Sequence, residues 1–155
     1  VKKHVPDAHM VMIGGGPLLQ RTRKLTRRLR LDIEFTGKVT LEKKVEYLQR
    51  AWVCLYTSEI EGFGLVALEA AASGTPCVGY AVGGLRESIK DRETGYLVPK
   101  GDITRLANTV VSILIDKQIL DKLSRNCVEH ARKYSWDTSA KKFESILATQ
   151  LVSDP

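Results

Sequence analysis

Short β-type runs that end in glycine turns alternate with helical stretches over most of the chain, and this alternation limits the fold more than any other feature. A strand, a glycine-containing turn and a helix in repetition are typical of a parallel sheet with helices on both faces. The sequence therefore predicts the α/β class. The β-type runs are His9–Ile13, Asp32–Thr36, Trp52–Thr57, Pro76–Tyr80 and Gly95–Val98. The runs at 52–57 and 76–80 are apolar almost without alternation, which indicates strands buried on both sides.

The pattern changes after Gly101, where only helical stretches follow. Asp102 is placed to cap the first of these helices. A later helix follows the motif YSWD at 134–137 and carries Phe143, Ile146 and Leu147 at helical spacing. We expect these helices to cover the sheet and close a single domain over residues 1–155, since 43% hydrophobic residues are enough for a sizeable core.

The formal net charge of +6 comes mainly from the segment Arg21–Arg30, which holds six basic residues. Leu18, Thr22, Leu25 and Leu29 recur at helical spacing, so we expect an amphipathic helix with its basic side chains on the outer face. A solvated surface helix and a peripheral contact with anionic lipid headgroups both fit this pattern. No aromatic residue interleaves with the arginines to stack on bases, which disfavours nucleic acid as a partner.

The three cysteines, Cys54, Cys77 and Cys127, are odd in number and form no CxxC pair, and Cys54 and Cys77 lie inside apolar runs. We therefore expect reduced core residues in a cytoplasmic protein. No apolar run approaches the roughly 20 residues that a membrane span needs, and the first residues lack the apolar segment of a signal peptide. We therefore predict a cytoplasmic domain, with peripheral contact at the inner face of the membrane as the one membrane association that the basic segment suggests.

Four glycine turns mark the ends of predicted strands: Gly14–Gly16, Gly37, Gly62–Gly64 and Gly83–Gly84. Ligands of open parallel sheets bind beyond these strand ends, where free N–H groups and the positive ends of helices attract phosphate. The residues Gly14, Gly15 and Gly16 are thus a candidate phosphate-side loop, although glycines at such positions also serve simply to reverse the chain. Neither GxxxxGK[ST] nor GxGxxG occurs, which argues against common nucleoside triphosphatases and dinucleotide enzymes.

The stretch SEIEGFGLVALEAAASGTP, residues 58–76, places two carboxylates near one helix. We expect the helix to begin near Gly64 or Leu65 and to end at Gly74, with Glu61 in the preceding turn and Glu69 about one and a half turns inside. The helix is apolar nearly all round, and no basic residue lies within helical reach of Glu69. Glu69 could face a thin solvated stripe or bind a distant arginine; alternatively, the vicinal hydroxyls of a polyol such as ribose could satisfy it.

Several ordered motifs together resemble the group 1 family of retaining, nucleotide-sugar-dependent glycosyltransferases, whose GT-B fold has two facing Rossmann-like domains. The motifs are IGGGP, FTGKV, the two glutamates with seven residues between them, GTPCV, the glycine pair at 83 and 84, GYLV and YSWD. The match covers essentially the whole chain and is to the C-terminal, donor-binding domain. The resemblance implies a Rossmann-like parallel sheet forming the C-terminal half of a GT-B fold, and hexosyl transfer to a glycan or a lipid-linked acceptor.

Carried over residue by residue, the resemblance implies that Glu61 binds hydroxyls of the donor sugar and that Glu69 binds the ribose. The main chain of Gly62, Phe63, Gly64 and Leu65 would hold sugar and diphosphate. Gly37, Lys38 and Val39 match the loop that lays main chain against the nucleobase. The family implies metal-independent transfer without a cofactor, and the sequence contains no Asp-x-Asp pair to hold a divalent ion.

The chain also departs from the family pattern. Gly15 stands where the family often has an acidic residue, so that side chain has no role here. The basic diphosphate residues of the family lie in a first strand and helix that precede this match, and the acceptor domain precedes them. We therefore expect a fragment that is inactive alone. A non-catalytic GT-B-like nucleotide-sugar-binding module and a basic interaction module using Arg21–Arg30 are the alternatives. The nucleotide, sugar, acceptor and linkage are not specified by these residues.

Overall fold

The computed structural model describes residues 1–152, with side chains up to Thr149, and contains five short parallel strands and seven helices within those residues. Strands β1 (Met10–Ile13) and β2 (Ile33–Gly37) form one parallel pair. Strands β3 (Cys54–Tyr56), β4 (Cys77–Tyr80) and β5 (Gly95–Val98) form a second parallel sheet in that order. The predicted α/β class with parallel strands is confirmed, and the strands are divided between two sheets.

The three-stranded sheet is covered on both faces, as predicted. On one face, Cys77 packs with Ala67 of α3 (Leu65–Ala72) and with Leu85 of the short helix α4 (Leu85–Ser88). On the other face, Val78 packs against two helices of the C-terminal half, α5 (Ile103–Ile115) and α6 (Lys117–Ala131). Successive β4 residues thus point into opposite clusters, because side chains alternate across a strand. All four β4 residues are buried, so this strand carries the core.

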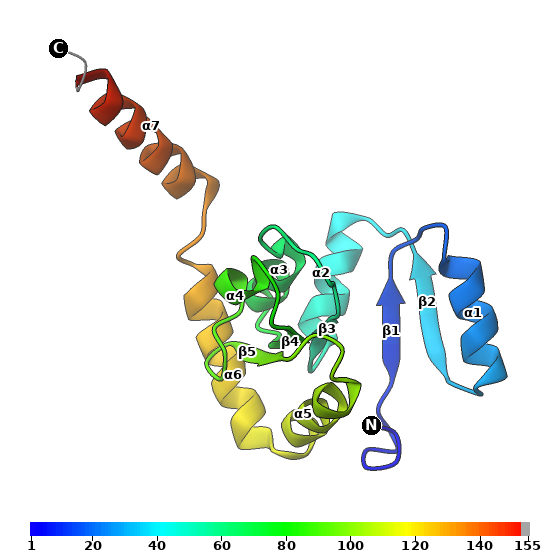
Figure 1. Cartoon of the computed structure of the whole chain (residues 1–155). Helices are drawn as coiled ribbons and strands as arrows, with labels where there is room; N and C mark the ends of the chain where they lie inside the picture. Colours follow the sequence, from blue (N-terminus) through cyan, green and yellow to red (C-terminus); the bar gives the residue numbers. More distant parts are fainter. Residues whose placement is uncertain (153–155) are drawn as a thin grey trace.

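Strand β3 is less buried than predicted, and the reason is its position. It pairs only with β4, and its other edge faces β1 across the space between the two sheets (Figure 1). Leu55 of β3 is 39% exposed, and Met10 of β1 is 38% exposed. Strands at the edge of a sheet lack a neighbour on one side, which leaves apolar side chains in contact with solvent.

The amphipathic helix predicted over the basic segment is α1 (Leu19–Arg28), but its buried face differs from the prediction. Leu18, Leu25 and Leu29 are 66%, 43% and 55% exposed, whereas Thr26 is buried. The helix lies beside β2 of a sheet that is only two strands wide (Figure 1), and so narrow a sheet offers little surface to cover the leucine stripe. The side chain of Arg23 also faces this sheet: it donates to the carbonyl of Phe35 and lies 5.5 Å from the centre of that ring.

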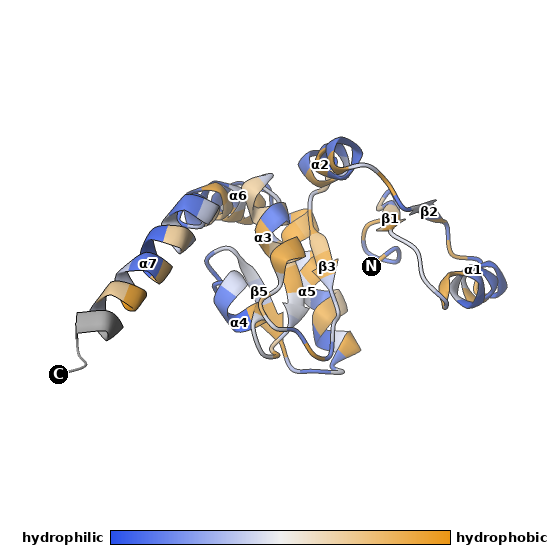
Figure 2. Cartoon of the chain, turned by 90° about the horizontal axis from the view of Figure 1, so that it is seen from above, coloured by the Kyte–Doolittle hydropathy of each residue, from blue (hydrophilic) through white to orange (hydrophobic). Residues whose placement is uncertain are grey.

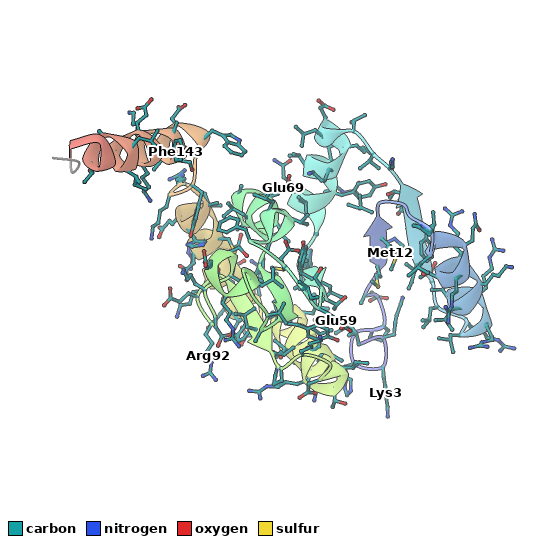
Figure 3. All side chains as sticks on the ribbon, turned by 45° about the horizontal axis from the view of Figure 1, so that its top comes forward. Lys3, Met12, Glu59, Glu69, Arg92 and Phe143 are labelled. Carbon is teal, nitrogen blue, oxygen red and sulfur yellow. The ribbon has the colours of Figure 1, made fainter. Side chains whose placement is uncertain are left out.

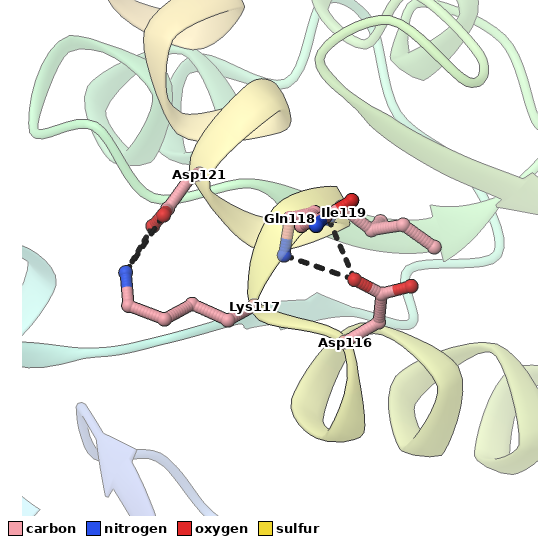
Figure 4. Close-up of polar contacts among 5 residues, drawn as sticks. All are labelled: Asp116, Lys117, Gln118, Ile119 and Asp121. Carbon is pink, nitrogen blue, oxygen red and sulfur yellow. Dashed lines mark hydrogen bonds and ion pairs between the residues drawn. The ribbon is translucent and has the colours of Figure 1, made fainter.

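The helix termini follow the predicted capping residues. Thr40 caps α2 (Leu41–Arg50) by accepting from the Lys43 N–H at 3.3 Å, and Asp102 caps α5 by accepting from the Arg105 N–H at 2.8 Å. Helix α6 has a cap that was not predicted: Asp116 accepts from the N–H groups of Gln118 and Ile119 (Figure 4). Side-chain acceptors at these positions satisfy N–H groups that have no partner inside the helix.

The last helix, α7 (Trp136–Val152), does not cover the sheet, contrary to the prediction. It extends away from the remainder of the chain in two views (Figures 1 and 2). Phe143, Ile146 and Leu147 are therefore all exposed. An apolar stripe at helical spacing identifies the helix but not the surface against which it packs.

The helices of the part of the chain that the structure describes include none whose length and apolar character would suit a membrane span.

The three cysteines are free thiols. Cys77 and Cys127 are buried and Cys54 is half-buried, in agreement with the prediction that these side chains contribute to the core.

Candidate functional site

Glu61 lies in the turn between β3 and α3, and its carboxylate is fixed by two donors. The Tyr56 hydroxyl donates to Oε2 at 2.6 Å, and the Gly64 N–H donates to Oε1 at 3.2 Å. The Tyr56 hydrogen bond lowers the pKa of Glu61, with further lowering by the main-chain N–H groups of Gly64, Phe63 and Gly62. In turn, burial and the hydrogen bond to Glu61 raise the pKa of Tyr56 to about 12. Glu61 is therefore an ionised and oriented acceptor at neutral pH.

Glycines set the path of this turn. Gly64 has φ 85°, a left-handed conformation that favours glycine, and a Cβ there would come within 2.6 Å of Leu85. The Gly84 N–H donates to the carbonyl of Glu61 at 2.9 Å, and a Cβ on Gly84 would lie 2.1 Å from the carbonyl oxygen of Gly62. From the sequence, the pair 83–84 was predicted as a turn at a strand end and as one of the family motifs, without a partner in the fold. The structure shows that this pair packs directly against the turn that carries Glu61.

Glu69 lies in the middle of α3, as predicted, but the helix around it is less buried than predicted. Ala67, Ala70 and Ala71 are buried, whereas Leu65 and Val66 are exposed. Lys44 of α2 donates to Oε1 of Glu69 at 2.7 Å, and Glu69 lies on the side of α3 that faces α2 (Figure 3). The alternative of a distant basic partner is thus partly realised, with a lysine in place of an arginine. The second oxygen, Oε2, is buried and has no hydrogen-bond partner among the described residues.

The two remaining predicted segments meet each other at the ends of β1 and β2. The Gly14 N–H donates to the Gly37 carbonyl at 2.8 Å, and a Cβ on Gly15 would contact the side chain of Lys38 at 3.9 Å. Gly14 and Gly37 both have positive φ, at 114° and 69°. The candidate phosphate-side loop 14–16 and the candidate nucleobase loop 37–39 are therefore neighbours. Helix α2 begins directly after this second loop.

The candidate site is thus assembled from two halves. The loops 14–16 and 37–39 belong to the β1–β2 sheet, while Glu61, Gly62–Leu65 and Glu69 belong to β3 and α3. The Lys44–Glu69 ion pair joins the helix that follows the first half to the helix of the second half. Among the residues that the structure describes, no group of three or more His, Cys, Asp or Glu side chains could hold a metal ion.

A chain of aromatic rings, which the sequence analysis did not find, supports the glycine turn. The ring of Phe63 lies 5.8 Å from that of Tyr134, and the ring of His130 lies 5.2 Å from that of Tyr134 in an edge-on arrangement. His130 is buried, and its Nε2 has no hydrogen-bond partner among the described residues. Burial lowers the pKa of His130, and the nearby Lys90 and Lys133 lower it further. Phe63 is far from His130 and Tyr134 in the sequence, so this contact could not be predicted from local spacing.

The family profile described as "Glycosyl transferases group 1" matches residues 1–134 of the chain. The chain is 38% identical over 129 residues to N-acetyl-alpha-D-glucosaminyl L-malate synthase of Bacillus anthracis, covering 82% of this chain and 32% of that protein. It is 36% identical over 157 residues to D-inositol 3-phosphate glycosyltransferase of Corynebacterium diphtheriae, covering 96% of this chain and 37% of that protein. The chain therefore spans about a third of the length of these relatives.

Solved structures agree with this relationship. Sucrose-phosphate synthase from Thermosynechococcus elongatus superimposes with a TM-score of 0.86 at 31% identity, over 97% of this chain and 40% of that chain. Anabaena HepE in complex with UDP-glucose superimposes with a TM-score of 0.83 over 93% of this chain and 42% of that chain. The identity to HepE is 22%, so this second likeness concerns the fold alone.

Proposed function

Because the chain belongs to the group 1 glycosyltransferase family, we propose that it is the donor-binding part of a retaining enzyme that transfers a hexosyl group from a nucleotide sugar. The observation that carries this proposal is the pair of carboxylates around the start of α3. Glu61 is ionised and fixed by Tyr56 and Gly64, and Glu69 has a buried oxygen without a partner. Both groups accept hydrogen bonds, and a nucleotide sugar offers hydroxyls that donate them.

Each half of the site has a distinct part in this proposal. Glu61 binds hydroxyls of the donor sugar, and the main chain of Gly62–Leu65 binds sugar and diphosphate at the start of α3. Glu69 binds the ribose. The main chain of Gly37, Lys38 and Val39 lies against the nucleobase, with Gly14–Gly16 on the phosphate side. The adjacency of the loops 14–16 and 37–39 supports this division, because base and phosphate belong to one ligand.

The proposed transfer uses no metal ion and no cofactor. Negative charge develops on the departing nucleoside diphosphate, and the N–H groups and positive end of α3 stabilise it. The acceptor hydroxyl attacks the same face of the sugar from which the diphosphate departs, aided by the leaving phosphate, and we assign no protein nucleophile. Glu61 is held ionised by Tyr56, so it positions the sugar and does not donate a proton. The pair Glu61 and Glu69 is therefore not an acid and base pair of the glycosidase kind.

The acceptor in this proposal is a glycan or a lipid-linked molecule. The exposed helix α1 would contribute a peripheral contact with anionic lipid at the cytoplasmic face of the membrane. Four basic side chains of α1 support this membrane contact, because they are exposed beside the exposed leucines and form no ion pair with an acidic residue among the described residues. They are Arg21, Lys24, Arg27 and Arg28. Sedimentation with vesicles containing phosphatidylglycerol, compared with phosphatidylcholine alone, tests this contact.

The proposed function is tested by measuring donor binding and sugar turnover in the full-length gene product. A thermal-shift panel of UDP-, GDP- and ADP-sugars identifies the donor, because a ligand that binds only the native state raises Tm. With that donor, Glu61→Ala should mainly lower kcat and Glu69→Ala should mainly raise the nucleotide Kd, each by about tenfold or more. Unchanged kinetics and binding in both variants would exclude the proposed site.

A further inference from the structure

Lys44 lies at the junction of the two halves of the candidate site, although its position in the sequence attracts no attention. It belongs to α2, and its Nζ donates to Oε1 of Glu69 at 2.7 Å across 25 residues of sequence. The two side chains are 29% and 38% exposed, so the pair is partly shielded from solvent. A charge-assisted hydrogen bond of this length orients the carboxylate.

The neighbouring Lys43 shows what an ordinary surface lysine does on this helix. Lys43 pairs with Glu46 one turn further along α2, where both side chains are more than half exposed. Such i,i+3 pairs have little effect on stability. Lys44 has no acidic residue three or four positions away on its own helix. Its partner is on α3 instead, so its ion pair is a tertiary contact between two helices.

The two oxygens of Glu69 consequently have different environments. Oε1 accepts from Lys44, whereas Oε2 is buried without a hydrogen-bond partner among the described residues. A buried acceptor without a donor is unfavourable, and a ligand that supplies a donor removes that cost. Because Oε2 is a hydrogen-bond acceptor, the complementary ligand group is a hydroxyl or an N–H group.

We propose that Lys44 is a positioning residue of the nucleotide site. It fixes the Glu69 carboxylate so that Oε2 accepts from a ribose hydroxyl, and it ties the helix that follows the nucleobase loop to that carboxylate. The site thereby selects a ribonucleoside diphosphate over its dideoxy counterpart. This inference rests on the proposed function, since it assumes that Glu69 faces the ribose.

The test measures nucleotide affinity by calorimetry in the protein as its own gene encodes it. The probes are whichever of UDP, GDP and ADP binds most tightly and its 2′,3′-dideoxy counterpart. Lys44→Met should weaken binding of the ribonucleotide by about tenfold and of the dideoxy nucleotide by less than about twofold. Lys44→Arg keeps a donor to the carboxylate and should retain most of the discrimination. The matched control Lys43→Met should change neither affinity by more than about twofold.

A double-mutant cycle separates positioning from a general contribution to folding. In a Glu69→Gln background, Lys44→Met should cause less than about twofold further loss of affinity, because the carboxylate it orients is absent. Equal weakening of both nucleotides by Lys44→Met, or no weakening where Glu69→Gln does weaken ribonucleotide binding, would overturn the role of Lys44 and leave the proposed function intact. If the wild-type protein binds none of the three nucleotides, the proposed function fails and this inference fails with it.

Discussion

Glu61 owes its fixed orientation to one hydroxyl and one main-chain amide. Tyr56 is the last residue of β3, and its hydroxyl reaches Oε2 of Glu61 from within the sheet. Gly64 is the residue directly before α3, so its N–H points back to Oε1. A strand end and a helix start therefore hold the same carboxylate from two sides. A rigid acceptor of this kind binds hydroxyls with little loss of side-chain entropy.

Removal of the Tyr56 hydroxyl tests this arrangement. In Tyr56→Phe the pKa of Glu61 should rise, because the hydrogen bond that lowers this pKa most is lost. Only the ionised carboxylate of Glu61 accepts hydrogen bonds at both oxygens without donating one, so the acid limb of kcat/KM should move to higher pH, and kcat should fall by about fivefold. The measurement is a pH profile with the donor identified above. Tyr47→Phe is the matched control, since Tyr47 donates to Glu34 at 2.7 Å outside the site; equal behaviour of the two variants would contradict the role of Tyr56.

We expect His130 to make the stability of the domain depend on pH. Its pKa in the folded state is lowered by burial and by Lys90 and Lys133, against opposing effects of the Ser88 main chain and of Glu93. The unfolded chain, with an ordinary pKa of about 6.5, then binds the proton more readily than the folded protein. The free energy of unfolding should consequently fall as the pH decreases through about 6.5, the ordinary histidine pKa.

Urea midpoints measured between about pH 5.5 and pH 8 test this effect, because this interval spans the ordinary histidine pKa of about 6.5. The loss of stability on acidification should be smaller in His130→Asn than in the wild type. His4 is exposed near the N-terminus, so His4→Asn serves as a control that retains the wild-type slope. An unchanged slope in His130→Asn would assign the pH dependence to other groups.

At the scale of elements, local sequence predicted what short-range chemistry decides. Thr40 and Asp102 cap the predicted helices, and the glycine turns follow the predicted strands. The partners of each apolar face were not predictable from spacing alone, because a stripe indicates a helix without indicating what covers it. Leu25 of α1 and Phe143 of α7 both belong to such stripes, and both are exposed. Lys44, likewise, could not be connected to Glu69, since that contact depends on how α2 and α3 pack.

The glycine pair before α4 provides a test of element packing. Gly84→Ala places a Cβ 2.1 Å from the Gly62 carbonyl, so the turn that carries Glu61 has to move. We expect a loss of unfolding free energy of about 1–3 kcal/mol, as for other overpacked sites, together with reduced donor turnover. Gly16→Ala is the stability control, because nothing lies within 4 Å of a Cβ there. Equilibrium urea unfolding compares the two variants; equal stability of Gly84→Ala and the wild type would refute the packing role.

At the scale of the whole molecule, the site depends on how two separate sheets are held together. The unpaired edge of β1 faces the unpaired edge of β3 across the space between the sheets (Figures 1 and 2). Among the described residues, the Lys44–Glu69 contact links α2 to α3 next to this space. The buried Thr75 hydroxyl also donates to the carbonyls of Leu48 and Ala51 at the end of α2. The positions of the nucleobase loop and of Glu69 relative to each other therefore rest on these contacts of α2 and not on strand pairing between the two sheets. The motifs predicted which residues each half contains, whereas the division follows from β1 and β3 belonging to different sheets, which the motifs do not encode.

We accordingly predict that the 155-residue chain, purified alone, binds a nucleotide sugar weakly and transfers no sugar. Because the two sheets share no strand pairing, ordering the two halves around a ligand costs part of the binding free energy, which lowers the apparent affinity. Calorimetry with UDP-, GDP- and ADP-sugars, alongside a radiolabelled transfer assay, measures both properties. The protein as its own gene encodes it is the comparison in each assay. Tight binding or detectable transfer by the 155-residue chain would contradict the prediction, because the two halves would then be sufficiently ordered to form the site.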